Sequence, residues 1–454
     1  MSLFQRKRPV VRIRGLHLDL KGLPPTRKRL FELLDLIASV RINCLVVEWE
    51  DVYPWRKYPE LQSESVYSAA TVKQFLARAR ELSIQVIPLI QSLGHMENIL
   101  SKKKFAHLRE VTENVGELCP CKAEGRELVL EMIEDILDSH DGITHFHLGG
   151  DEAWSMGSCA RCKEVVQKHG KAYLYLKHVL PLIDALEKKG VRAVLWDDMM
   201  RNWSMSALRK VSSKADLMVW SYKAEPLDGI GENRISRKIL SRYNKANIVL
   251  WGASAFKGAD GFSSDLPDMK NRRSNLIAWV NEAKQNNFVG LVATGWSRYN
   301  TFRAPCEGLE SALDGLVLAG ASMWDGSLPE DSVVSARAFL NSGKLKELAG
   351  KRFLSCLKAS QELKVWRANT MAYLESISSL AHIAGEPNRK NSYEEKRAIV
   401  ALRNCLHKGK QYGCNWIKAH RGLVPNIWLE RYIDSRLLPM ERFARAILNE
   451  LGSE

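Results

Sequence analysis

The chain has 454 residues, of which 45% are hydrophobic and 26% charged, and its formal net charge is +15. This composition is that of a globular protein with a large core, and it excludes disordered, collagen-like, coiled-coil and low-complexity proteins. The positive charge is concentrated in the tail, where residues 341–454 include 20 basic and 11 acidic side chains.

Short β-branched apolar segments recur along the first two thirds of the chain, and each is followed by a segment with apolar residues at three- and four-residue spacing. The predicted strands are Val11–Leu18, Ile42–Trp49, Ile84–Ile90, Ile143–Leu148, Val191–Trp196, Asp216–Trp220, Asn247–Trp251 and Phe288–Ala293. Eight strand–helix units predict an α/β fold, a (β/α)8 TIM barrel. The competing doubly wound sheet would have a glycine-rich phosphate turn after its first strand, but the chain reads HLDLKGLPP there.

From about Pro329 onward the strand-like segments stop, and the chain becomes helical and basic. We therefore predict two domains, a TIM barrel over residues 1–328 and a basic α-helical domain over residues 329–454. The tail has no continuous basic arm, and its aromatic residues follow helical spacing. We expect it to pack as a domain or to form a homodimer contact, with no nucleic acid as partner.

The basic N-terminus is not followed by the apolar segment and small-residue cleavage site of a secretory signal. No stretch approaches the ~18 uninterrupted apolar residues of a membrane span. The nine cysteines are an odd number, and most of them lie singly, as is typical of free thiols in a reducing cell interior. The sequence thus predicts a cytoplasmic protein without a membrane partner.

Aromatic and polar residues gather where the predicted strands end, which is the edge that holds the active site in TIM barrels. Strands five to eight are each followed or closed by a tryptophan, namely Trp196, Trp220, Trp251 and Trp296. The apolar C–H faces of a pyranose ring pack on aromatic rings, while its hydroxyls bind polar groups. A ring of tryptophans near carboxylates therefore predicts a sugar site.

The sharpest signal is the pair Asp151 and Glu152, which follows Gly149 and Gly150 after the fourth predicted strand. The two glycines allow the backbone to bend and to approach a substrate closely. Two adjacent carboxylates repel each other, and this repulsion raises one of their pKa values. Such a pair can keep one carboxylic acid protonated near neutral pH, so that it can act as a general acid.

The segment HLGGDEAW resembles the H-x-G-G-D-E signature of glycoside hydrolase family 20, the β-N-acetylhexosaminidases. The resemblance continues in chain order through RGLHLDLKG, VVEWEDVYPW, IPLIQSLGHME, LWDDM, LWGASAFKGA and TGWSRYN, and it covers roughly residues 10 to 320. This set is similar to the cytosolic hexosaminidase D branch of the family and its bacterial relatives. The C-terminal helical region lies outside the resemblance.

The resemblance implies exo-acting, retaining hydrolysis of terminal β-linked N-acetylglucosamine or N-acetylgalactosamine by substrate-assisted catalysis, without a cofactor. Glu152 would protonate the glycosidic oxygen and later activate water. Asp151 would hold the substrate's 2-acetamido group, whose carbonyl oxygen attacks the anomeric carbon to form an oxazolinium ion. We expect an ionised Asp151 and a protonated Glu152 in the resting complex.

Further site residues follow from the same resemblance. Arg14 matches an arginine that binds sugar hydroxyls, His95 and Asp19 match supporting positions, and Glu307 is a ligand for the O4 or O6 end of the sugar. Many relatives outside this branch have a carboxylate two residues after the eighth-strand tryptophan, where this chain has Arg298. This departure leaves open whether the site prefers the gluco or the galacto configuration.

The resemblance also assigns the walls of the site. Trp196, Trp220 and Trp296 match the aromatic residues around the acetamide and the sugar ring. The family has a tyrosine that bonds the acetamide oxygen, and Tyr222 and Tyr299 are both candidates for it.

Two other functions compete with hydrolysis by this mechanism. His145 and His147 form an H-x-H pair that could bind a metal in a metal-dependent hydrolase, although the later strand ends carry tryptophan in place of further ligands. A barrel that binds an amino sugar without cleaving it is the other alternative. The intact pair of Asp151 and Glu152 argues against this binder, because binding alone gains nothing from a protonated carboxylic acid.

Four cysteines lie in the loops after the third and fourth predicted strands, which are neighbours in a barrel. They form a C-x-C and a C-x-x-C motif and comprise Cys119, Cys121, Cys159 and Cys162. Their spacing permits a structural zinc site, a disulfide or unlinked thiols. Any zinc there should brace the loops and take no part in the reaction.

Overall fold

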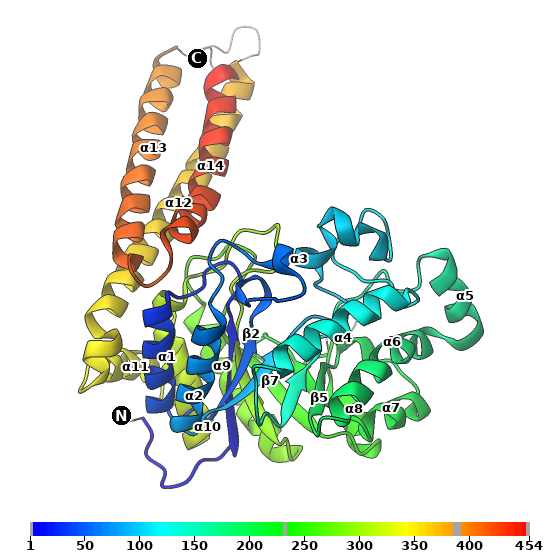
Figure 1. Ribbon diagram of the computed structural model, residues 1–454. Helices are drawn as coiled ribbons and strands as arrows, with labels where there is room; N and C mark the ends of the chain where they lie inside the picture. The colour runs from blue at the N-terminus through cyan, green and yellow to red at the C-terminus, as the bar shows by residue number, and fades with distance from the viewer. Residues whose placement is uncertain (1–2, 230–233, 385–391, 451–454) are drawn as a thin grey trace.

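A computed structural model describes residues 3–229, 234–384 and 392–450 (Figure 1). Eight parallel strands form a closed barrel in chain order. The strands are β1 (Ile13–Asp19), β2 (Cys44–Glu48), β3 (Gln85–Leu89), β4 (His145–His147), β5 (Arg192–Trp196), β6 (Ala215–Trp220), β7 (Leu250–Lys257) and β8 (Gly290–Gly295). The predicted TIM barrel is confirmed, and every predicted strand overlaps an observed one.

Helices surround the barrel and connect its strands (Figure 1). They are α1 (Arg27–Ser39), α2 (Ala69–Glu81), α3 (Glu97–Leu100), α4 (Ala123–Leu137), α5 (Ala160–His169), α6 (Lys171–Glu187), α7 (Met205–Ser212), α8 (Arg237–Lys245), α9 (Met269–Gln285) and α10 (Leu313–Asp325). Hydroxyl and carboxylate side chains set several of the starting points. Thr26, Ser68, Ser204, Ser236 and Asp268 each accept a backbone N–H of the first helical turn.

The seventh strand differs from its predicted bounds, because it runs from Leu250 to Lys257 and does not end at Trp251. Gly252 therefore lies within the strand and does not begin a turn. A Cβ atom at Gly252 would lie 2.9 Å from side-chain atoms of both Leu291 and Phe288, so the glycine permits close packing on the neighbouring strand.

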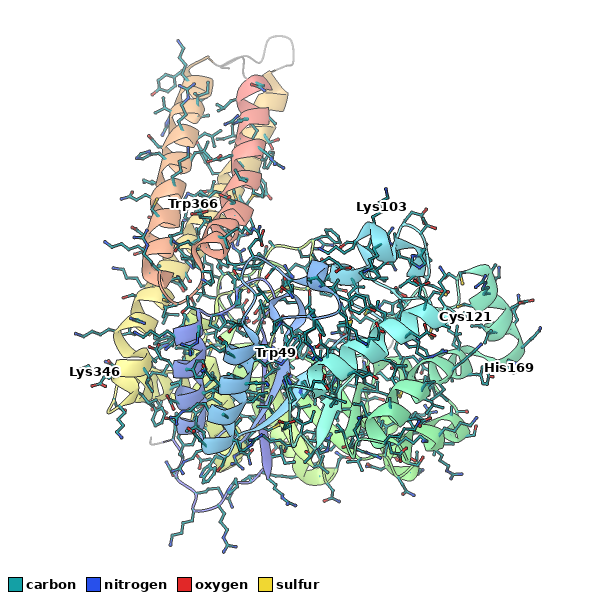
Figure 2. The ribbon with its side chains drawn as sticks, in the orientation of Figure 1. Trp49, Lys103, Cys121, His169, Lys346 and Trp366 are labelled. Atoms are coloured by element: carbon teal, nitrogen blue, oxygen red, sulfur yellow. The ribbon has the colours of Figure 1, made fainter. Side chains whose placement is uncertain are left out.

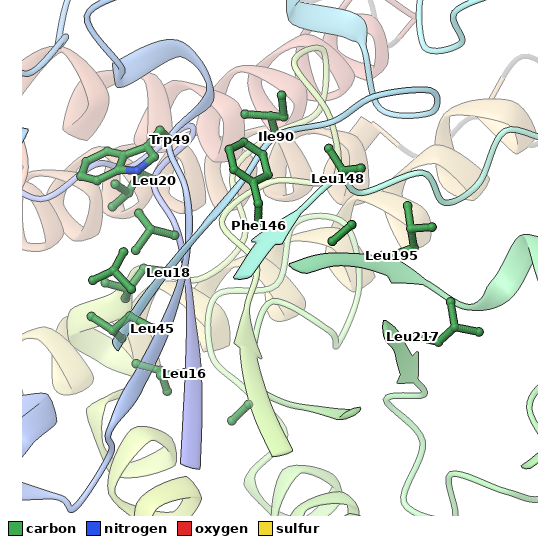
Figure 3. Packing of buried hydrophobic residues seen from close by; sticks show 14 of the residues in the cluster. Leu16, Leu18, Leu20, Leu45, Trp49, Ile90, Phe146, Leu148, Leu195 and Leu217 are labelled. Carbon is green, nitrogen blue, oxygen red and sulfur yellow. The ribbon is translucent and has the colours of Figure 1, made fainter. Parts of the chain in front are cut away.

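Alternation along the strands separates an inner from an outer core. Leu16, Leu18, Leu45, Phe146 and Leu195 point outward into the layer between strands and helices (Figure 3). A second, smaller cluster fills the interior of the barrel and includes Cys44, Val46, Ile87, Leu89, Val194, Trp196, Met218, Trp251, Ala253 and Val292. The interior is therefore packed with side chains, so a substrate can bind only at an end of the barrel.

The long helices α12, α13 and α14 follow the barrel and stand beside one another as a bundle at its edge (Figure 1). The C-terminal helices are α11 (Ser332–Leu340), α12 (Lys351–Ala384), α13 (Ser392–His420) and α14 (Asn426–Glu450). The core cluster of the barrel includes residues as far along the chain as Phe353, and the core cluster of the bundle combines residues from Ala359 onward with Leu23. α11 therefore contributes Ala336 and Leu340 to the core of the barrel, and the domain boundary at residue 329 stays a prediction.

The bundle is tied to loops at the active-site end of the barrel. Asp265, in the loop after β7, forms ion pairs with Arg436 at 3.0 Å and with Arg367 at 2.6 Å. Trp428 Nε1 donates to Ser65 Oγ in the loop after β2 at 3.0 Å. These contacts support a packed domain that braces the loops. Among the residues that the structure describes, no helix is both long and apolar enough to cross a membrane.

Candidate active site

A pocket of about 300 Å³ opens at the carboxyl ends of the strands. Most of the site residues predicted from the sequence line it, and they come from the ends of β3, β4, β5, β6 and β8. Its lining comprises Lys21, Gln91, His95, Asp151, Glu152, Trp196, Trp220, Tyr222, Arg234, Gly258, Ala259, Gly261, Phe262, Trp296, Arg298, Tyr299 and Cys306.

The two carboxylates reach the pocket through a tight bend after β4. Gly149 and Gly150 have φ angles of 60° and 81°, in the left-handed region that favours glycine. A Cβ atom at Gly150 would lie 2.4 Å from Tyr175 Oη, which donates to the Gly150 carbonyl oxygen at 2.9 Å. The glycines predicted to bend the chain are therefore required by both backbone angle and space.

His95 faces both carboxylates. Its Nε2 lies 3.4 Å from Asp151 Oδ2 and 3.2 Å from Glu152 Oε2. The preceding Gly94 packs directly on this loop, since a Cβ there would lie 2.0 Å from the Asp151 carbonyl oxygen. His95 and Glu152 themselves have positive φ angles of 53° and 48°. Such strained backbone is held in place by surrounding packing and is concentrated at functional sites.

Each of the two carboxylates has a distinct environment. Glu152 Oε2 accepts a hydrogen bond from the Tyr299 hydroxyl at 2.9 Å. Asp151 is more deeply buried, and its Oδ1 has no hydrogen-bond partner among the described residues. A buried acceptor of this kind is available to a donor on a ligand.

His95 and Tyr299 both influence the protonation of Glu152. Burial acts to raise the pKa of Glu152, but hydrogen bonds from His95 and Tyr299 outweigh it and hold that pKa below its usual value. Burial likewise acts to lower the pKa of His95, but the facing carboxylates raise it well above 6.5. These directions favour a proton on His95 over one on Glu152 in the free enzyme, and the protonated Glu152 expected in the resting complex stays a prediction.

Lys21 is a pocket residue that the sequence analysis missed. Its Nζ lies 2.8 Å from Glu48 Oε2 and 3.1 Å from Asp19 Oδ2. Glu48 is also bound by Gln91, whose Nε2 donates to Glu48 Oε1 at 3.0 Å. A lysine two residues beyond the first strand was the available signal, because residues following a barrel strand lie at its active-site end.

Arg298 lies opposite acidic residues from the end of β2. Its Nη2 is 3.3 Å from Glu50 Oε1 and 3.1 Å from Asp51 Oδ2. Burial nevertheless raises the pKa of Glu50 to about 8, against the effect of Lys21 and Arg298. This wall of the pocket thus offers the cations of Lys21 and Arg298, backed by paired carboxylates, as donors to a ligand.

Aromatic rings form the remaining walls. The Trp220 and Tyr222 rings stack with centroids 5.4 Å apart, and the Trp196 and Trp296 rings lie 6.0 Å apart. Asp198 links this wall to the loop that carries Asp151 and Glu152, because it accepts from Trp220 Nε1 at 3.3 Å and from the Glu152 N–H at 3.0 Å. Burial, with the charges of Asp151 and Asp197 nearby, raises the pKa of Asp198 to about 7.

Three residues predicted for the site lie elsewhere. Arg14 is the second residue of β1, about 16 Å along the strand from Asp19. Trp251 is the second residue of β7, and its Nε1 donates to Asp216 Oδ2 at 3.0 Å inside the barrel. Glu307 is fully buried and accepts from the Gly258 N–H and the Ser264 hydroxyl, so it holds the loop after β7 in place and does not line the pocket.

The side chain of Arg14 makes a structural contact. Its guanidinium donates to the carbonyl oxygens of Arg41, Arg12 and Val11 at 2.6, 2.8 and 3.1 Å. It also lies 5.0 Å from the centre of the Trp324 ring. These contacts join the start of β1 to neighbouring segments at the end of the barrel opposite the pocket.

We expect Arg14→Ala to lower the free energy of unfolding by about 2 kcal/mol, because buried charge-assisted hydrogen bonds are lost. Urea unfolding measures this change, and KM for an aryl glycoside should stay within about twofold of the wild type. A large rise in KM with unchanged stability would show that Arg14 binds the sugar after all.

The histidine pair does not assemble a metal site at the pocket. His147 Nδ1 accepts the Gly149 N–H at 3.0 Å, and its ring packs on Trp196 with centroids 4.5 Å apart. His145 lies 3.6 Å from Asp216 Oδ2 within the barrel. Over the described ranges, the residues grouped so that they could hold a metal are Glu110, Cys119, Cys159 and Cys162, none of which lines the pocket.

Comparison with known proteins agrees with this geometry. Residues 12–304 match the catalytic domain of glycosyl hydrolase family 20. Hexosaminidase D of Bos taurus is 31% identical over 351 residues, which cover 75% of this chain and 100% of the relative. Hexosaminidase D of Homo sapiens is 31% identical over 346 residues, which cover 74% of this chain and 70% of the relative.

Solved structures show the same fold. The β-N-acetylhexosaminidase of Bacteroides fragilis superposes with a TM-score of 0.55 at 17% identity, covering 76% of this chain and 75% of that one. The chitobiase of Flavobacterium johnsoniae gives a TM-score of 0.54 at 16% identity, covering 98% of this chain and 73% of that one. Together with the pair of carboxylates in the pocket, the matched domain shows that this chain belongs to glycosyl hydrolase family 20, the β-N-acetylhexosaminidases.

Proposed function

We propose that this glycoside hydrolase is an exo-acting, retaining enzyme that releases terminal β-linked N-acetylglucosamine or N-acetylgalactosamine by substrate-assisted catalysis. One observation carries the proposal. Among the described residues lining the pocket, the carboxylates are Asp151 and Glu152, which are adjacent in the chain and contact the same His95 nitrogen. A two-carboxylate retaining enzyme has its nucleophile and its acid on opposite sides of the scissile bond, whereas these two carboxylates come from one loop and face one histidine.

The substrate's acetamide would then supply the nucleophile. Trp196, Trp220 and Trp296 enclose its methyl group and the sugar ring, and the buried Oδ1 of Asp151 accepts its N–H. The acetamide oxygen attacks the anomeric carbon, forms the oxazolinium ion and expels the leaving group. This arrangement directs the negative charge of Asp151 at the nitrogen that becomes positive in the transition state.

Glu152 would be the general acid in the first step and the general base in the second. His95 Nε2 lies 3.2 Å from Glu152 Oε2, so the proton on His95 can pass to Glu152 when a glycosidic oxygen occupies the site. Glu152 then protonates the leaving oxygen, and afterwards takes a proton from the water that opens the oxazolinium ion. Two displacements at the anomeric carbon give retention of the β configuration.

Tyr222 is the better candidate of the two tyrosines for the acetamide oxygen. The hydroxyl of Tyr299 already donates to Glu152, and 42% of Tyr299 is exposed at the mouth of the pocket. Tyr222 stacks on Trp220 in the wall. We therefore assign Tyr222 to the acetamide and Tyr299 to Glu152.

The small pocket supports removal of a single terminal sugar. Its volume of about 300 Å³ is at the lower end of the range for small-molecule sites. A site that binds several sugars of a chain would need a longer cleft.

The test is release of a chromophore from aryl β-N-acetylglucosaminide and β-N-acetylgalactosaminide, with a thiazoline mimic of the oxazolinium ion as inhibitor. We expect turnover of at least one substrate, tight competitive inhibition, and a β-configured sugar as the first product in a proton NMR time course. A protein that binds both free sugars but cleaves neither substrate would be a sugar-binding barrel. An α-configured first product would exclude the retaining mechanism.

A further inference from the structure

A cluster of three cysteines and one glutamate joins two loops beside the active site. Cys119 Sγ lies 3.5 Å from Cys162 Sγ and 3.6 Å from Cys159 Sγ. Together with a carboxylate oxygen of Glu110, these sulfur atoms all lie within 4.8 Å of one another. Cys119 and Glu110 belong to the long connection between β3 and α4, whereas Cys159 and Cys162 begin α5.

The distances between the sulfur atoms suit a tetrahedral metal. A disulfide would bring two sulfurs to about 2.05 Å, and the cysteines of this cluster are free thiols. In a tetrahedral zinc site with Zn–S bonds of about 2.3 Å, the sulfurs stand about 3.8 Å apart. The separations of 3.5 and 3.6 Å are close to that value, so a metal could enter with only small movements of the side chains.

Glu110 provides a second, independent indication. Its Oε1 accepts the N–H groups of Gly157 and Cys159 at 2.9 and 3.0 Å, and these bonds fix the orientation of the carboxylate. Its Oε2 is buried and has no N–H or O–H donor among the described residues, so the thiols of Cys119, Cys159 and Cys162 are the groups left to interact with this carboxylate. A thiol is only a weak donor, so a cation would satisfy this buried carboxylate oxygen better than the thiols do.

The start of α5 is also suited to thiolates. Cys159 caps this ten-residue helix, and its Sγ accepts the Cys162 N–H at 3.4 Å. The positive end of the helix dipole lies at this point and favours negative charge on sulfur. Thiolate and carboxylate ligands around one tetrahedral centre favour zinc over the harder divalent cations.

We propose that this protein binds one structural Zn²⁺ ion through the thiolates of Cys119, Cys159 and Cys162 and the Oε2 atom of Glu110. Cys121, which was grouped with these cysteines from the sequence, is half-buried, and its thiol interacts with that of Cys162. It lies outside the group of four ligand atoms. Figure 2 shows Cys121 on the side of the barrel away from the helical bundle.

The ion would brace the catalytic loop without touching the substrate. Cys159 follows Glu152 by seven residues, and Ser155 between them already donates its N–H and its hydroxyl to Glu117 Oε2 at 2.8 and 2.7 Å. Zinc would add a second link between the same two segments. Its loss should therefore lower thermal stability and kcat together, while KM changes little.

Zinc content of the full-length protein tests the proposal. We expect about one zinc per chain by plasma mass spectrometry after purification without a metal-affinity tag, and less than a tenth of that for Cys119→Ser and Cys162→Ser. Cys414→Ser, at an exposed cysteine of α13, is the matched control and should keep its zinc. Protein without zinc that also fails to take up one equivalent of added Zn²⁺ would overturn the proposal.

Two further measurements separate folding defects from ligand loss and identify the fourth ligand. Wild-type protein loaded with Co²⁺ should show sulfur-to-cobalt charge-transfer bands and the intense visible bands of tetrahedral cobalt, and octahedral spectra would contradict the site. Glu110→Gln should weaken zinc binding at least tenfold in competition with a chelator, whereas Cys121→Ser should bind as the wild type does. If Cys121→Ser weakened zinc binding and Glu110→Gln did not, Cys121 would be the fourth ligand, and the assignment of Glu110 would be overturned.

Discussion

Glu152→Gln should lower kcat for an alkyl β-N-acetylglucosaminide by about 1,000-fold, because glutamine cannot protonate the departing oxygen. A nitrophenyl leaving group needs little protonation. For a nitrophenyl substrate, the decrease in kcat should therefore be at least tenfold smaller. Steady-state kinetics across a series of leaving groups measures this difference. A loss that is equal for all leaving groups would contradict the role of Glu152 as the acid.

The same variant should change the pH profile. In the wild type, His95 has a raised pKa and Glu152 a lowered one, so their shared proton is lost only as the pH rises through the raised pKa of His95. Activity should therefore fall on the alkaline side, above the ordinary histidine value of about 6.5. Glu152→Gln should lack this alkaline fall, because its residual activity does not depend on that proton.

The free energy of unfolding should also depend on pH through His95 and Glu152, with one residue setting the alkaline limit and the other the acidic limit. The raised pKa of His95 contributes stability that is complete below about pH 6.5 and is lost as the pH rises through the raised value. The lowered pKa of Glu152 contributes stability that is complete above about pH 4.5 and is lost as the pH falls through the lowered value. The pair therefore stabilises the fold most between these limits.

Glu97→Gln serves as a control for the Glu152 variant. Glu97 is a buried glutamate two residues from His95, and it does not line the pocket. Its replacement should leave the dependence on the leaving group unchanged. A dependence like that of Glu152→Gln would show that any change of charge near His95 produces the effect.

The barrel and the loop that carries Asp151 and Glu152 could be predicted from the sequence because both depend on local patterns. Apolar strands followed by amphipathic helices define the barrel, and Asp151 and Glu152 follow two glycines directly after a strand. Strand ends were harder to predict, because a glycine within a strand and a glycine in a turn look alike. Gly252 is such a case, and it led to the placement of Trp251 at the pocket.

Contacts between distant segments could not be predicted from local patterns. Arg14 lies near the start of β1 and Lys21 two residues beyond its end, so the bounds of β1 decide which of them reaches the active-site end. The selection of Glu110 over Cys121 in the cysteine cluster depends on how the connection from β3 to α4 folds back on α5. The protonation of Glu152 depends on His95 and Tyr299, which come from two other loops.

Asp151→Asn should lower kcat by about 1,000-fold, with the loss nearly the same for alkyl and nitrophenyl leaving groups. The reason is that Asp151 would act on the acetamide, whose attack is needed whatever the leaving group. A charged acceptor aimed at the developing positive charge is an electrostatic contribution of this size. Asparagine can accept the same hydrogen bond with one orientation of its amide, so the variant mainly removes the charge.

Affinity for the thiazoline inhibitor separates this role from simple substrate binding. If Asp151 stabilises the oxazolinium-like transition state, the inhibition constant of Asp151→Asn should rise in proportion to the loss in kcat/KM, because the inhibitor mimics that state. The inhibition constant of Glu152→Gln should rise far less, because Glu152 acts on the leaving group and on water. A variant of Asp151 with raised KM, unchanged kcat and unchanged inhibition would place Asp151 in ground-state binding, and the acetamide would then need another partner in the pocket.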